Sequence, residues 1–131
     1  MVIFLYGKDA YRRREKLKDI TGEYARKRGV TDFREIDCEE NENFLVETVE
    51  FLRQASMFAD SKFLVLKNAD EIFGLEAGQV KEVKEIIKSF LENDNIFTLI
   101  TSEDKPNKGF DFLLKKPVVF QEFQELNGEE L

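Results

Sequence analysis

The sequence contains no histidine, no tryptophan and only one cysteine, Cys38, among its 131 residues. Without histidine, the chain can form neither a Cys–His nucleophile nor a zinc site built from Cys and His ligands. A lone cysteine cannot close a disulfide within the chain, and this usage is typical of a reducing compartment, so we expect a cytoplasmic location. The apolar run Val2–Tyr6 is too short for a signal peptide or a transmembrane span.

A surplus of basic residues is also missing, because the formal net charge is -7 and the pI is about 4.8. A domain that binds the nucleic acid backbone by neutralising phosphates usually carries a basic surplus. One local basic stretch exists, at Arg12, Arg13, Arg14, Lys16 and Lys18, and nucleic-acid binding through it is one alternative. We favour the interpretation of this stretch as a solvated helix face with i,i+4 ion pairs.

The residues that are present fit a single globular domain over residues 1–131. Hydrophobic residues make up 42% of the chain and charged residues 36%, which separates it from disordered sequences. The aromatic content is almost entirely phenylalanine, with 13 residues, and phenylalanine can be buried without a polar partner. We therefore expect most of these rings to lie in a core.

Short apolar runs alternate with helical patterns along the whole chain. The predicted strands are residues 2–6, 32–37, 62–68, 95–102 and 117–123. Apolar stripes at helical spacing are Leu17, Ile20 and Tyr24; Leu45, Val49 and Leu52; and Val80, Val83, Ile87 and Phe90 or Leu91. Asp9 and Asn43 are candidate helix caps, and residues 109–115 are a candidate helical turn. The alternation predicts an α/β fold with a five-stranded, mostly parallel sheet, helices on both faces, and residues 32–37 near an edge.

The turn after the first strand is where such a sheet would bind a nucleotide phosphate. A phosphate-binding loop needs several glycines followed by Lys and Ser or Thr, so that backbone amides can face the phosphates. Here the turn offers only Gly7 and Lys8, and the bulky Tyr11 follows closely. We interpret Gly7 and Lys8 as a plain turn between a strand and a helix.

The end of the third strand lacks the second part of a nucleotide site. ATPases of this layout place an acidic pair there to hold magnesium and polarise water. In this chain Lys67 and Asn68 occupy the place, and we expect Asp70 and Glu71 to cap the next helix instead. The sequence thus predicts no catalytic residue, no metal site and no cofactor, with an active NTPase of unusual loop sequence as an alternative. A receiver domain would also need an aspartate at the end of this strand.

Residues 54–62 join the second predicted helix to the third strand and contain two adjacent large apolar side chains, Met57 and Phe58. Adjacent positions on a helix do not share a face, so both cannot easily serve one core stripe. In a turn both can project outwards as anchors for a partner. The alternative, which the local sequence alone favours, is that the same two side chains close the core beneath the loop.

Several pieces of the chain, in this order and spacing, resemble the delta subunit of the bacterial DNA polymerase III clamp loader. The matching pieces are residues 3–7 (IFLYG), 54–58 (QASMF), 62–70 (KFLVLKNAD) and 123–131 (FQELNGEEL). The resemblance implies an AAA+-like first domain of the P-loop NTPase type, with a degenerate nucleotide site at Gly7, Lys8, Lys67 and Asn68. It also implies that the smaller lid domain and the collar domain of the family are missing from this truncated chain.

The resemblance further implies a partner. In that family the loop after the second helix carries a Leu-Phe pair that enters a hydrophobic pocket on the ring-shaped sliding clamp and helps to open the ring. Met57 matches the Leu and Phe58 the Phe, and Leu to Met preserves volume and apolarity. Gln54, Ala55 and Ser56 would present this pair, with Asp60 and Ser61 at its rim. The full-length protein would join the other loader subunits and meet DNA only weakly or indirectly, with no membrane partner.

Overall fold

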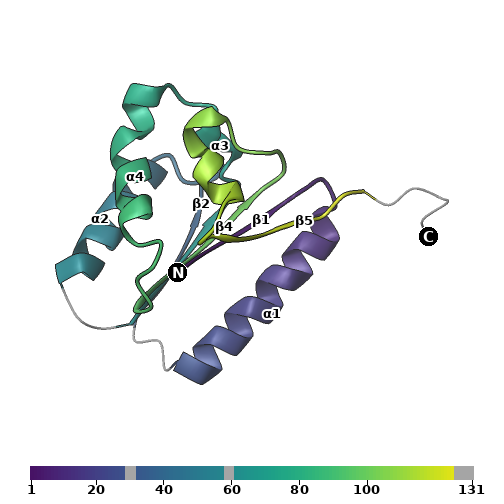
Figure 1. Ribbon diagram of the computed structural model, residues 1–131, viewed down its shortest axis with the longest axis horizontal. Helices are drawn as coiled ribbons and strands as arrows, with labels where there is room; N and C mark the ends of the chain where they lie inside the picture. Colours follow the sequence, from purple (N-terminus) through teal and green to yellow (C-terminus); the bar gives the residue numbers. More distant parts are fainter. Residues whose placement is uncertain (29–31, 58–60, 126–131) are drawn as a thin grey trace.

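The computed structural model describes residues 1–28, 32–57 and 61–125, apart from the side chains of residues 25, 27, 28 and 55–57. The elements are β1 (Val2–Tyr6), α1 (Ala10–Arg28), β2 (Asp32–Asp37), α2 (Phe44–Met57), β3 (Lys62–Lys67), α3 (Asp70–Phe73), α4 (Ala77–Ser89), β4 (Ile96–Ser102), the 3-10 helix η1 (Lys108–Leu114) and β5 (Val119–Glu122). Within these residues, five strands form one sheet in the order β2-β3-β4-β1-β5. Every pairing is parallel, which confirms the predicted α/β fold (Figure 1).

The burial of each strand follows from its place in the sheet. β3 and β4 lie in the middle and are built from continuous apolar runs, because both faces of a central parallel strand are covered. β2 is an edge strand, as predicted, and its residues are mostly exposed except for Ile36. β5 forms the other edge, and all four of its residues are exposed.

Helices cover both faces of the sheet, which confirms the predicted three layers (Figure 1). In the described part of the chain, one face carries only α1, whose Leu17, Ile20 and Tyr24 pack on the sheet. The Tyr24 ring centre lies 4.9 Å from that of Phe63 and 4.1 Å from that of Phe97. The opposite face carries α2, α3, α4 and η1 over the larger core cluster.

The predicted stripes on the helices pack as expected, with additions. Val80, Val83 and Ile87 of α4 are buried, and so are Val49 and Leu52 of α2. The second stripe also includes Phe51, which the pattern did not predict. The predicted turn at residues 109–115 is the 3-10 helix η1. No helix among the described residues has the length and apolar content needed to cross a membrane.

The helix caps agree with the sequence in part. The carboxylate of Asp9 accepts a hydrogen bond from the backbone N–H of Arg12 at 3.0 Å, which confirms this cap. The Asn43 carbonyl accepts the first backbone hydrogen bond of α2, from Glu47. The prediction for Asp70 was wrong. It lies in the first turn of α3, but its carboxylate accepts the backbone N–H groups of residues 103 and 104, in the loop after the neighbouring strand β4, both at 2.9 Å.

Candidate functional site

The turn after β1 is shaped by a close approach of the chain that follows β5. Gly7 has a φ of 130°, and a Cβ at this position would lie 2.2 Å from the carbonyl oxygen of Phe123. The Phe123 N–H donates to the Tyr6 carbonyl at 2.7 Å, and the Phe123 carbonyl accepts from the Asp9 N–H at 3.1 Å. Gly7 is therefore required by this backbone contact, a long-range reason that the local sequence did not reveal.

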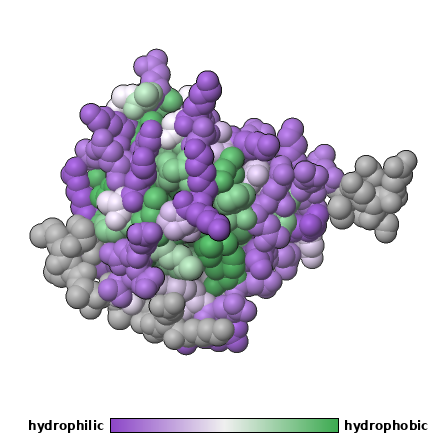
Figure 2. All heavy atoms as spheres, in the orientation of Figure 1, coloured by the Kyte–Doolittle hydropathy of each residue, from purple (hydrophilic) through white to green (hydrophobic). Residues whose placement is uncertain are grey.

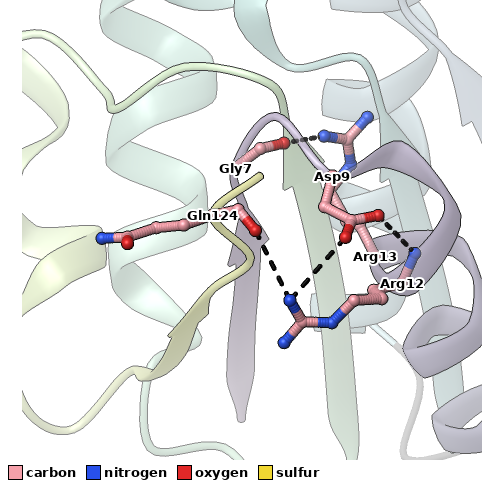
Figure 3. A network of polar contacts seen from close by, with 5 residues as sticks. All are labelled: Gly7, Asp9, Arg12, Arg13 and Gln124. Carbon is pink, nitrogen blue, oxygen red and sulfur yellow. Dashed lines mark hydrogen bonds and ion pairs between the residues drawn. The ribbon is translucent and has the colours of Figure 1, made fainter. Parts of the chain in front are cut away.

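The start of α1 is surrounded by protein groups (Figure 3). The guanidinium of Arg12 lies 3.7 Å from the Asp9 carboxylate, and it donates to the Gln124 carbonyl at 3.4 Å. The guanidinium of Arg13 donates to the Gly7 carbonyl. Arg12 thus joins the start of α1 to the chain after β5, and Arg13 joins α1 to the Gly7 turn. The Asp9 carboxylate occupies a helix start that would otherwise be free to accept an anion.

The end of β3 places a cation where a magnesium-binding carboxylate would be needed. The Lys67 ammonium lies 3.0 Å from a carboxylate oxygen of Glu35 on the neighbouring strand. Asn68 adopts a left-handed backbone with a φ of 57°, and its side-chain amide donates to the Asp37 carboxylate at 2.7 Å. These contacts tie the end of β3 to the end of β2.

A cavity of about 200 Å³ lies between α1 and the carboxyl ends of the strands. Its lining comprises Arg13, Arg14, Leu17, Asp37, Lys67, Asn68 and Thr101. Three cationic side chains face a single carboxylate, so the local charge repels a divalent cation. No cluster of three potential metal ligands occurs among residues 1–28, 32–57 and 61–125.

The environment of the buried cysteine keeps its thiol protonated. Cys38 follows β2 and is 3% exposed. Burial, together with the charges of Asp37 and Glu71, raises the pKa of its thiol to about 12. Burial and then the charge of Glu122 also raise the pKa of Tyr6. Neither group ionises readily near neutral pH.

The described ends of the predicted clamp-binding segment, residues 54–57 and 61–62, lie at the amino ends of the strands, whereas the Gly7 turn lies at their carboxyl ends. It begins on the last turn of α2, where Gln54 is exposed and Met57 is the final helical residue, and it ends at the first residue of β3. The side chains of Ala55, Ser56 and Met57 lie outside the described residues. Phe58 and Asp60 lie wholly outside them, whereas Ser61 is described.

Ion pairs flank this segment on both sides. Before it, the Arg53 guanidinium lies 3.0 Å from the Glu82 carboxylate of α4. At its last residue, the Lys62 ammonium lies 2.7 Å from the Asp32 carboxylate of β2, and Lys62 is only 9% exposed. The Lys62 N–H also donates to the Asn95 carbonyl at 2.9 Å. The two ends of the segment are thus fixed to the helical layer and to the sheet.

Comparison with known proteins places the Gly7 turn and residues 54–62 within the match to one family. A family model described as DNA polymerase III, delta subunit, matches residues 4–123 of the chain. The matched region includes the Gly7 turn, the end of β3 and residues 54–62. None of the curated proteins compared with the chain matches it.

Proposed function

The chain belongs to the DNA polymerase III delta subunit family, a component of the clamp loader in DNA replication, and from this premise we propose that it binds the sliding clamp through residues 54–58. In this proposal Met57 and Phe58 are the anchors, Gln54, Ala55 and Ser56 present them, and binding helps to hold the ring open. Residues 1–131 are the AAA+-like first domain of a cytoplasmic protein. The lid and collar domains of the full-length protein would join the other loader subunits.

The placement of residues 54–62 supports this role. The segment follows a helix whose described residues already bury Val49, Phe51 and Leu52 against the sheet. Its flanks are fixed by the Arg53–Glu82 and Lys62–Asp32 ion pairs. A short segment held at both ends loses less conformational entropy on binding than a free one.

We also propose that the domain itself is non-catalytic. The residues at the carboxyl ends of the strands support this part of the proposal. The Gly7 turn packs against Phe123, and Asp9 caps α1. Lys67, Arg13 and Arg14 make the neighbouring cavity cationic. Productive ATP hydrolysis needs magnesium and amides free to hold the phosphates, and this arrangement favours neither.

Isothermal titration calorimetry of the chain against a bacterial sliding clamp tests the anchor. Phe58→Ala should weaken binding by about 2 kcal/mol or more, roughly thirtyfold in Kd, because hot-spot aromatics contribute at least this much. Phe120→Ala is the matched control, since Phe120 is 45% exposed on β5 and distant in sequence from the segment. It should leave the Kd unchanged. Unchanged affinity of the Phe58 variant, with the wild type binding, would refute the assignment of the anchor.

The two alternative functions predict other results. An active NTPase would bind ATP with magnesium in the same calorimeter, whereas we expect no heat of binding. A nucleic-acid-binding domain would show strongly salt-dependent affinity for DNA. We expect little, because Arg12 and Arg13 already hold the Gly7 turn.

A further inference from the structure

The helix α4 carries three lysines on one side. Lys81, Lys84 and Lys88 are spaced by three and four residues, so their side chains are neighbours along the helix. Like charges at this spacing destabilise a helix slightly. None of the three forms an ion pair with any residue in the described part of the chain. Lys88 lies in the last turn of α4, where a cation is favourable, but the charges of Lys81 and Lys84 have no such explanation among the described residues.

A groove of about 550 Å³ lies beside these lysines, between α4 and the η1 region. Its apolar lining comes from the partly exposed Leu75 and from Val80 and Phe110, which belong to the buried core and are only 5% and 2% exposed. Among the described residues that line it, the three lysines face one carboxylate, that of Glu85. Figure 2 shows apolar atoms between columns of hydrophilic side chains on the face that carries α4 and η1.

The lysine side chains reach from α4 toward the opposite wall. The Lys84 ammonium lies 3.9 Å from the point that a Cβ on Gly109 would occupy. The Lys88 ammonium lies 5.5 Å from the centre of the Phe112 ring, within the range of a cation–π contact. The lysine ammonium groups therefore lie beside the apolar lining of the groove, on a chain whose net charge is -7.

We propose that this groove, defined by Leu75, Val80, Lys81, Lys84, Lys88 and Phe110, binds a segment of a partner protein that carries glutamates or aspartates beside a large apolar side chain. The apolar side chain would rest on the exposed part of Leu75, beside the buried Val80 and Phe110, and the carboxylates would pair with the lysines. Charge complementarity selects an acidic segment. The apolar lining favours a peptide over a nucleic acid backbone, which has nothing to place on it. The surface consists of other residues than segment 54–62, so the proposal does not depend on the proposed clamp anchor.

Fluorescence anisotropy with a labelled amphipathic peptide tests the groove. The probe combines glutamates with leucines at i and i+4 in an alanine background, and a second probe replaces the leucines by serine. The wild-type protein should bind the leucine probe at least about tenfold more tightly than the serine probe, because both charge and apolar contact contribute. Absence of binding at millimolar peptide, or equal affinity for the two probes, would overturn the proposal.

Charge-reversal variants locate the site. Lys81→Glu combined with Lys88→Glu should weaken binding of the leucine probe at least about tenfold, because both side chains are exposed and line the groove. Lys16→Glu combined with Lys18→Glu makes the same change of charge on α1 and should alter the Kd less than about twofold. Equal loss in both variants would mean non-specific attraction and would refute the groove. Tighter binding of a single-stranded oligonucleotide of equal charge would show that the surface serves nucleic acid instead.

Discussion

Replacement of Gly7 by alanine should strongly destabilise the protein, because a backbone contact leaves no room for a side chain. The residue has a φ of 130°, and the new Cβ would stand 2.2 Å from the Phe123 oxygen and 2.6 Å from its backbone nitrogen. Real Cβ atoms essentially never approach another atom more closely than 3.0 Å. Either Gly7 must change its backbone conformation, or the chain at Phe123 must move away from β1.

The magnitude follows from the contacts that this movement would break. An alanine held at such a φ costs about 1–3 kcal/mol. The hydrogen bonds from Phe123 N–H to Tyr6 and from Asp9 N–H to Phe123 contribute about 1 kcal/mol each. We therefore expect Gly7→Ala to lower the free energy of unfolding by about 3–5 kcal/mol, with the 4% exposed Phe123 ring becoming accessible as β5 separates.

Gly22→Ala is the matched control and should have the opposite sign. Gly22 lies within α1, and nothing stands within 4 Å of the position its Cβ would take. Alanine there restricts the unfolded chain and favours the helix, which should raise the free energy of unfolding by about 0.5–1 kcal/mol. Urea unfolding followed by circular dichroism measures both variants, with the wild type beside them.

The result that would refute the reasoning is a Gly7→Ala variant destabilised by less than about 1 kcal/mol. Such a protein would accommodate a side chain at the turn, so the approach of Phe123 would not explain the glycine. A glycine kept only to admit a phosphate would behave in this way, since alanine would impair the ligand and spare the free protein.

Two further predictions concern ionisable groups. Because the thiol pKa of Cys38 is raised to about 12, the folded state keeps its proton above pH 9, where the unfolded state loses it. The free energy of unfolding should therefore fall by up to about 1.4 kcal/mol per pH unit between pH 9 and 12. In Cys38→Ala this contribution of the thiol to the pH dependence should be absent, as measured by urea unfolding at each pH. The same pH dependence in the variant and the wild type would contradict the burial of the thiol. Asp9→Ala should cost about 1 kcal/mol through loss of the α1 cap, whereas Asp19→Ala, exposed on the same helix, should cost less than about 0.5 kcal/mol in the same assay. Equal effects of the two changes would mean that the cap contributes nothing.

The sequence predicted the sheet well because burial leaves a local trace in each strand. The continuous apolar runs in β3 and β4 correspond to central strands that are covered on both faces. The mixed sequence of β2 corresponds to an edge. The features of the candidate sites could be predicted only where they depend on residues adjacent in the sequence. The absence of a phosphate loop after β1 and the cation at Lys67 are properties of a few adjacent residues.

Contacts between distant parts of the chain left no such trace. Asp70 was expected to cap its own helix, because an acid at a helix start usually does. Its actual partners, the amides of residues 103 and 104, come from the loop after β4. The pairing of the Gly7 turn with Phe123 spans most of the chain in the same way. No periodicity in the sequence marks either contact, because each depends on two loops that meet only once the sheet is assembled.

The contacts at the carboxyl ends of the strands explain how this fold can be stable without a nucleotide. In a nucleotide-binding domain the phosphates would neutralise the start of the first helix and fill the turn before it. Here the Asp9 carboxylate supplies the negative charge, and the Phe123 carbonyl accepts the Asp9 N–H. Arg12 then joins the start of α1 to the chain after β5, and Arg13 joins α1 to the Gly7 turn (Figure 3). Because protein groups take these places, the proposed clamp-binding residues at the amino ends of the strands would not depend on a bound nucleotide. Such independence is what the proposed role, clamp binding without an ATPase cycle, would require.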